Sequence, residues 1–144
     1  MPIQATTVPT TEYVIKLNRL LEKFVVFETV FDEYAQTCRN ISLGKCLVNE
    51  NLETLKLYFE QNLTVLRQFV AQAGSVEPPI VFEQINQELQ SALADYVVAT
   101  ETMVDSLEGD ELTVYQRIIL GRSEQTVQRQ RINQVLQAIS KVGF

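Results

Sequence analysis

Histidine does not occur in the 144 residues of this sequence. Its absence removes the side chain that most often serves as a general acid or base and as a metal ligand. It also excludes a histidine-phosphotransfer bundle and a ferritin-like bundle, which needs paired Glu-x-x-His motifs. The chain has no glycine-rich phosphate loop, no G-x-S-x-G elbow and no Cys-x-x-Cys pair. We therefore expect a protein that is not an enzyme and that uses neither a metal ion nor a cofactor.

Cysteine and long apolar runs are also scarce. The two cysteines, Cys38 and Cys46, are expected to be a core thiol and a loop thiol in a reducing compartment, with a disulfide between them as the alternative. The longest apolar runs, such as residues 24–27, fall far short of the roughly 20 residues that span a bilayer. Residues 1–9 have neither the basic region nor the apolar stretch of a signal peptide. We therefore expect a cytoplasmic protein.

The charge of the chain is acidic but uneven. The net charge is -6 overall. Residues 1–110 hold 7 Lys/Arg and 16 Asp/Glu, a net charge of -9, whereas residues 111–144 hold 5 and 2, a net charge of +3. An acidic chain gains nothing from the phosphate contacts of nucleic acids and is repelled by anionic membranes, so we expect neither as a partner. The basic last quarter favours an acidic partner or self-association.

A heptad pattern dominates residues 11–40. Positions alternately four and three residues apart are all apolar or aromatic, which the alternation of a β-strand does not produce. They are Tyr13, Leu17, Leu20, Phe24, Phe27, Phe31, Tyr34, Cys38 and Ile41. This segment predicts a long helix in which Phe24, Phe27 and Phe31 are buried in the core.

Two more segments repeat this rhythm, at about 50–73 and at about 79–107. The fourth segment is less regular, because a polar stretch at 121–126 interrupts its apolar stripe. The stripe consists of Leu112, Tyr115, Ile118 and Ile119 before the interruption and of Ile132, Val135, Leu136, Ile139 and Val142 after it. Asn49 is the expected N-cap of the second helix. The fourth segment is either one helix, straight or kinked, or a helix that breaks near Gly121, because a single glycine costs only about 1 kcal/mol. Short turns between long helices favour antiparallel neighbours. The sequence therefore predicts an all-α, up-and-down antiparallel four-helix bundle.

The domain organisation follows from the same pattern. The chain has the length of one ordinary domain, and its apolar content of 46% is enough for a core. Residues 1–10, rich in proline and threonine, are expected to be a flexible N-terminal tail. Residues 11–144 are expected to be a single helical-bundle domain.

A layer of polar residues is predicted near the middle of the bundle. If the fourth helix keeps the heptad that Leu112, Tyr115 and Ile119 begin, its next inward positions are polar. An up-and-down bundle brings these positions level with polar residues at the middles of the other helices. The candidate ligand-binding residues are Glu28, Asn62, Tyr96, Arg122, Thr126 and Arg129. Such a layer fixes helix register or lines a small-molecule pocket; alternatively, the fourth helix rotates and its arginines face water, since buried arginine is costly unless it is paired.

Several apolar residues lie off the best core positions of their helices. Val25 and Val26 on the first helix and Val97 and Val98 on the third are the candidate interface residues. We expect a homodimer formed through these faces, because exposed apolar patches mark interaction sites. The function that the sequence favours is a non-enzymatic protein–protein interaction module with a regulatory or signalling role. The alternative is a bundle that binds a small molecule at the polar layer.

Overall fold

The structure, a computed structural model, describes residues 10–44, 51–105 and 107–141. It is an all-α bundle of four helices, and there is no β-strand in these three ranges. The helices are α1 (Thr10–Ser42), α2 (Leu52–Gly74), α3 (Glu83–Asp105) and α4 (Glu111–Lys141), and a short 3-10 helix, η2 (Ile80–Phe82), leads into α3.

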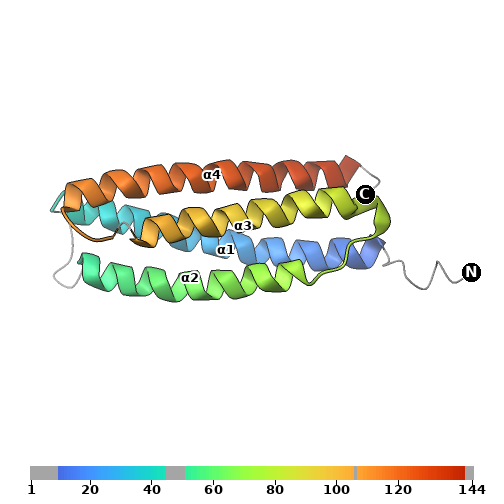
Figure 1. Cartoon of the computed structure of the whole chain (residues 1–144), viewed down its shortest axis with the longest axis horizontal. Coiled ribbons are helices and arrows are strands. Elements are labelled where there is room, and N and C mark those ends of the chain that lie inside the picture. The colour runs from blue at the N-terminus through green and yellow to red at the C-terminus, as the bar shows by residue number, and fades with distance from the viewer. Residues whose placement is uncertain (1–9, 45–50, 106, 142–144) are drawn as a thin grey trace, which may run out of the picture.

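The helices form an antiparallel ring. Each runs opposite to the one before it, and α4 and α2 lie on opposite sides with α1 and α3 between them (Figure 1). The principal contacts join α1 to α2, α2 to α3, α3 to α4, and α4 back to α1. This is the predicted up-and-down four-helix bundle, in which α1 and α3 occupy diagonal corners.

The helix boundaries follow local capping. The side chain of Asn51 accepts a hydrogen bond of 2.8 Å from the backbone N–H of Thr54, so Asn51 caps α2. The expected cap, Asn49, lies outside the described residues. Asp110 likewise accepts from the backbone N–H of Thr113, at 3.1 Å, at the start of α4. Gly109, just before it, has a φ of 109°, in the region that favours glycine.

The aromatic core confirms the heptad of the first helix. Phe24, Phe27 and Phe31 are all buried. The rings of Phe27 and Phe31 each lie 5.4 Å, centroid to centroid, from phenylalanines of α2, Phe69 and Phe59 respectively. Cys38, on the same side of α1, is buried as expected, while Cys46 lies outside the described residues.

Of the two registers that the sequence left open for the fourth helix, α4 does not adopt the one through Leu112, Tyr115 and Ile119. Leu112 and Ile119 are exposed and Tyr115 is half-buried. The residues that are buried instead are Val114, Ile118, Gly121, Gln125, Ile132, Val135 and Ile139. With Gln128 placed between Gln125 and Ile132, successive positions on this line are three or four residues apart. The line therefore continues the buried stripe to the end of the helix. The competing register would point Arg122 and Arg129 directly into the core, which is costly.

Gly121 lies inside one unbroken helix, so α4 does not break there. A Cβ atom at Gly121 would lie 2.0 Å from Cγ of Met103 on α3, far closer than van der Waals contact. The glycine therefore allows α4 to approach α3 closely, and α4 packs much more extensively on α3 than on α1.

The domain boundary shifts slightly from the prediction. Thr10, expected in the tail, is the first residue of α1, and residues 1–9 of that tail lie outside the described residues. Within the described ranges, no helix is long and apolar enough to cross a membrane.

Candidate functional site

Glu28 on α1 is the centre of a polar cluster inside the bundle. Its Oε2 accepts a hydrogen bond of 2.5 Å from the hydroxyl of Tyr96 on α3. The same oxygen lies 3.0 Å from Nη1 of Arg122 on α4, which donates to it. The Glu28 and Arg122 side chains are only 13% and 17% exposed, so this ion pair lies largely out of water. Three helices are thereby joined through one carboxylate.

The cluster continues between α3 and α4. Nη1 of Arg122 also donates to Oε1 of Gln125, at 2.6 Å. The amide of Gln125 donates to the hydroxyl of Thr100, at 2.7 Å, and that hydroxyl donates to the carbonyl of Tyr96, at 2.8 Å. Tyr96, Thr100 and Gln125 are fully buried. We call Glu28, Tyr96, Thr100, Arg122 and Gln125 the polar layer.

Two further charged residues flank the polar layer. Nη2 of Arg122 lies 3.5 Å from Oδ1 of Asp32, one turn after Glu28 on α1. Nε of Arg129 lies 3.6 Å from Oε1 of Glu28. That buried oxygen has no hydrogen-bond partner within the part of the chain that the structure describes. The Arg129 guanidinium is therefore the charged group that lies beside this oxygen, while Arg122 pairs with the other oxygen of the same carboxylate.

The pKa of Tyr96 is raised well above the ordinary value for a phenol. Burial is the largest cause, because it disfavours the tyrosinate, and the hydrogen bond and charge of Glu28 act in the same direction. The nearby Arg122 opposes them. Tyr96 therefore stays a protonated donor to Glu28 through the physiological pH range.

Four of the six predicted ligand-binding residues are brought together, namely Glu28, Tyr96, Arg122 and Arg129. Thr126 lies beside them on α4, where its hydroxyl donates to the carbonyl of Arg122 at 2.9 Å.

Asn62 does not join this cluster. Its side-chain amide donates to the hydroxyl of Tyr34 on α1, at 2.7 Å, and to the carbonyl of Tyr58, at 3.0 Å. Thr100 and Gln125 were not among the residues predicted from the sequence. The signal for Gln125 is its place seven residues after Ile118 and seven before Ile132, which points inward in the register through Ile118.

The basic charges of α4 are largely balanced inside the chain. Arg122 and Arg129 face Glu28, and Arg131 lies 2.8 Å from Glu88 and 2.7 Å from Asp95, both on α3. The uneven charge of the sequence therefore reflects complementarity between α4 and the acidic helices beside it.

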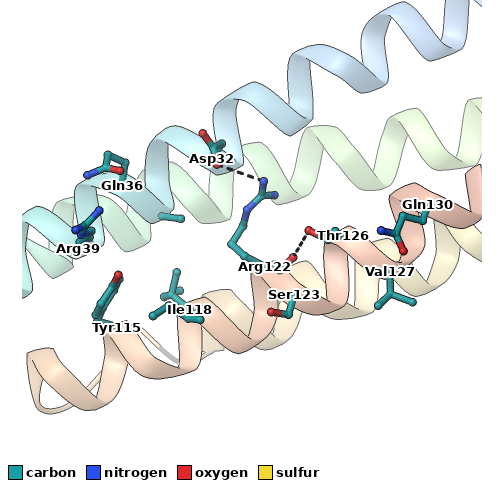
Figure 2. A pocket seen from close by; sticks show the side chains of 12 residues that line it. Asp32, Gln36, Arg39, Tyr115, Ile118, Arg122, Ser123, Thr126, Val127 and Gln130 are labelled. Carbon is teal, nitrogen blue, oxygen red and sulfur yellow. Dashed lines mark hydrogen bonds and ion pairs between the residues drawn. The ribbon is translucent and has the colours of Figure 1, made fainter. Parts of the chain in front are cut away.

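A groove of about 560 Å³ opens between α1 and α4, next to the polar layer. Figure 2 shows Arg122 reaching from α4 toward Asp32 across this groove. Tyr115, Ile119 and Val127 of α4 line it with Arg39 of α1. The groove is explained by the preceding geometry, since close packing at Gly121 draws α4 toward α3, and long charged side chains bridge the gap to α1.

The predicted interface valines do not form one patch. Val25, Val26 and Val98 are exposed, but Val97 is half-buried and packs against the core. The two pairs also lie on helices at diagonal corners of the bundle, so one partner surface does not reach both. The homodimer itself stays a prediction.

Comparisons of the chain with protein-family models, with curated proteins and with solved structures found no match. In the part of the chain that the structure describes, no three Cys, Asp or Glu side chains are grouped so as to hold a metal ion.

Proposed function

We propose that this protein is a non-enzymatic protein–protein interaction module that binds a helix of its partner in the groove between α1 and α4. The observation that carries the proposal is an exposed face of α4 without charge. It consists of Leu112, Gln116, Ile119, Ser123, Val127 and Gln130, and we call it the α4 outer face. Regulatory and signalling proteins commonly bind an amphipathic helix in such a groove.

The chemistry of the α4 outer face suits a helix-binding site. Its members follow one another at spacings of three or four residues, as the contact positions of packed helices do. Ile119, Ser123, Val127 and Gln130 line the groove. Protein interfaces are depleted of charge at their centres, because each buried charge must be desolvated. The α4 outer face has no charge, although 21% of the residues in the chain are charged. A partner can therefore cover this face with a small desolvation penalty.

The groove is long enough for a helix. Its lining runs along α4 from Tyr115 to Gln130, which corresponds to about 22 Å at 1.5 Å per residue, or about four helical turns. Asp32 and Arg39 stand exposed on the α1 side of the groove and carry opposite charges. The expected partner segment is an amphipathic helix with an uncharged face and both signs of charge along one flank.

Site-specific photo-crosslinking in the native host tests this proposal. A photoreactive phenylalanine derivative replaces Ile119 on the α4 outer face or, as the control, Val65 on α2, which is similarly exposed. We expect a protein adduct from position 119 alone, and we expect the crosslinked peptide to belong to an amphipathic helix. A synthetic peptide of that sequence should then bind the purified protein, and Val127→Lys should abolish the binding while Val65→Lys preserves it.

Other outcomes contradict the proposal. Equal adducts from positions 119 and 65 would show nonspecific capture. The absence of any protein adduct at position 119 would favour the small-molecule alternative. That alternative stays a prediction, and its support is that Arg122 and Thr126, two of the residues predicted for it, line the groove.

A further inference from the structure

A second groove, of about 620 Å³, lies between α3 and α4 on another side of the molecule. Two small residues that line it, Ala99 and Gly121, are buried, whereas Val98 and Leu120 are exposed beside them. Leu120, with 67% of its surface exposed, is the most exposed large apolar residue among those described. An apolar side chain thus projects next to a groove whose floor includes small buried residues.

Two charges of opposite sign flank Leu120 on the same helix. Arg117 lies three residues before it and Glu124 four residues after it, and both line this groove. Neither forms an ion pair with any residue in the described ranges, although Arg122, Arg129 and Arg131 of the same helix all do. The groove therefore carries a positive and a negative charge, neither in an ion pair within the described residues, about 10 Å apart along the helix at 1.5 Å per residue.

We propose that this surface binds a second copy of the same chain. The two α4 helices run antiparallel, and a two-fold axis lies between them at the level midway between Leu120 and Gly121. This axis places Arg117 of each copy at the level of Glu124 of the other copy. The Leu120 side chains then meet at the axis, beside the groove that Val98 and Ala99 line. A two-fold contact between identical surfaces is the commonest form of homodimer.

Charge complementarity selects the antiparallel arrangement. A parallel two-fold pairing of α4 would set Arg117 against Arg117 and Glu124 against Glu124, and like charges facing each other disfavour association. The antiparallel pairing sets each charge against its opposite and satisfies both pairs at once. The surface is distinct from the α4 outer face and does not depend on the proposed function.

Analytical ultracentrifugation over a concentration series tests the inference. We expect the parent chain to form dimers that weaken as salt is added, because exposed ion pairs are screened. Leu120→Lys should give monomers. Arg117→Glu and Glu124→Arg should each weaken dimerisation at least tenfold, and the double variant should restore it, because the ion pairs re-form with their charges exchanged. Val65→Lys, on α2, serves as the matched control and should leave the dimer intact.

Each other result overturns the inference. A parent chain that stays monomeric up to its solubility limit excludes the dimer. A dimer that survives Leu120→Lys uses another face. A double variant that fails to regain dimerisation, while circular dichroism shows that it is folded, excludes the antiparallel register.

Discussion

The Glu28 carboxylate interacts with three other side chains. It forms an ion pair with Arg122, accepts a hydrogen bond from the Tyr96 hydroxyl and lies near Arg129, and the Glu28 side chain itself has little exposure to water. Partly buried ion pairs contribute little net stability, because desolvation offsets their attraction, but removing one partner is costly. We therefore expect the polar layer to act mainly by specifying one register and one rotation of α4 against α1 and α3.

Replacing Glu28 with glutamine tests this role at the level of one residue. Glu28→Gln keeps the shape but leaves the Arg122 guanidinium without its close counter-charge, and we expect a loss of about 1–3 kcal/mol in the free energy of unfolding. The control is Glu22→Gln, an exposed position on the same helix, which should change stability by no more than about 0.5 kcal/mol. Urea denaturation near pH 7 measures both. Equal midpoints for the two variants would show that the layer is dispensable.

Tyrosine hydroxyls link α1 to its neighbours at other levels of the bundle. Tyr13 donates to Oδ1 of Asn86 on α3 at 2.8 Å, and Tyr34 accepts from Asn62 on α2. Burial raises the pKa of Tyr13 to about 12. It also raises the pKa of Tyr34, with the Glu33 charge adding to the effect. These hydroxyls are thus held protonated as structural hydrogen-bonding groups.

Alkaline pH should therefore unfold the protein. Above about pH 10, tyrosines of the unfolded chain lose their protons while Tyr13 and Tyr96 of the folded chain keep theirs. The folded state then binds more protons, so stability is fully present below pH 10 and is lost as the pH rises toward the folded pKa. The slope is about 1.4 kcal/mol per pH unit for each such tyrosine. Urea midpoints between about pH 9 and pH 11 measure it. Tyr13→Phe should reduce the slope, and an unchanged slope in that variant would contradict the assignment.

At the level of elements, α4 is the helix that decides the architecture. Its buried line places Gly121 against Met103 of α3 and Gln125 against Thr100, while Arg122 extends sideways to α1. The helix therefore packs closely on one neighbour and is bridged by charges to the other. The groove between α1 and α4 is a consequence of this asymmetry.

Substitution of Gly121 tests the close packing of α3 and α4. Alanine is the better helix former by about 1 kcal/mol, so an unconstrained site would gain stability. Here the new Cβ would collide with Met103, and we expect Gly121→Ala to lower the free energy of unfolding by about 1–3 kcal/mol through overpacking. In a Met103→Ala background, which removes the obstacle, the same change should raise stability. Stabilisation by Gly121→Ala in the parent chain would show that the two helices are farther apart.

Helix α1 shows what the sequence could predict, and helix α4 shows where the sequence left two registers open. The heptad of α1 holds large apolar residues at every inward position, so one register is clearly preferred and the structure follows it. In α4 two lines compete, one through Ile119 and one through Ile118, and local spacing does not rank them. The contacts with α3 decide between the two lines. Met103 leaves room for only a glycine at position 121, and the Thr100 hydroxyl accepts a hydrogen bond from Gln125 at the level of the polar layer.

The prediction of the polar layer succeeded in part for a related reason. Arg122 was placed at an inward position, yet it lies at the edge of the core and reaches Glu28 with its long side chain. Helix mid-points are level in an up-and-down bundle, which brought Glu28, Tyr96 and Arg122 together. Asn62 is near the middle of α2, but its side chain faces Tyr34. The height of a residue along the bundle does not determine the direction in which its side chain points around the helix axis.

At the scale of the whole molecule, the seams of the ring differ in character (Figure 1). Phenylalanine rings join α1 to α2, and close backbone approach joins α3 to α4. Charged side chains bridge α1 and α4, and the groove beside them exposes an uncharged helix face. We therefore propose the α1–α4 side, with its uncharged α4 outer face, as the side on which a partner helix binds.

Thiol accessibility in the native host shows directly whether a partner occupies the groove between α1 and α4. Val127 lies in the α1–α4 groove and Val65 on α2, and each is 49% exposed. Val127→Cys and Val65→Cys are made in a Cys46→Ser background, in which the native Cys38 is buried. In the purified protein both new thiols should react with a maleimide at similar rates. In host cells the thiol at position 127 should be protected severalfold relative to the one at position 65. Equal labelling of the two positions in cells would contradict the proposal that a partner occupies the groove.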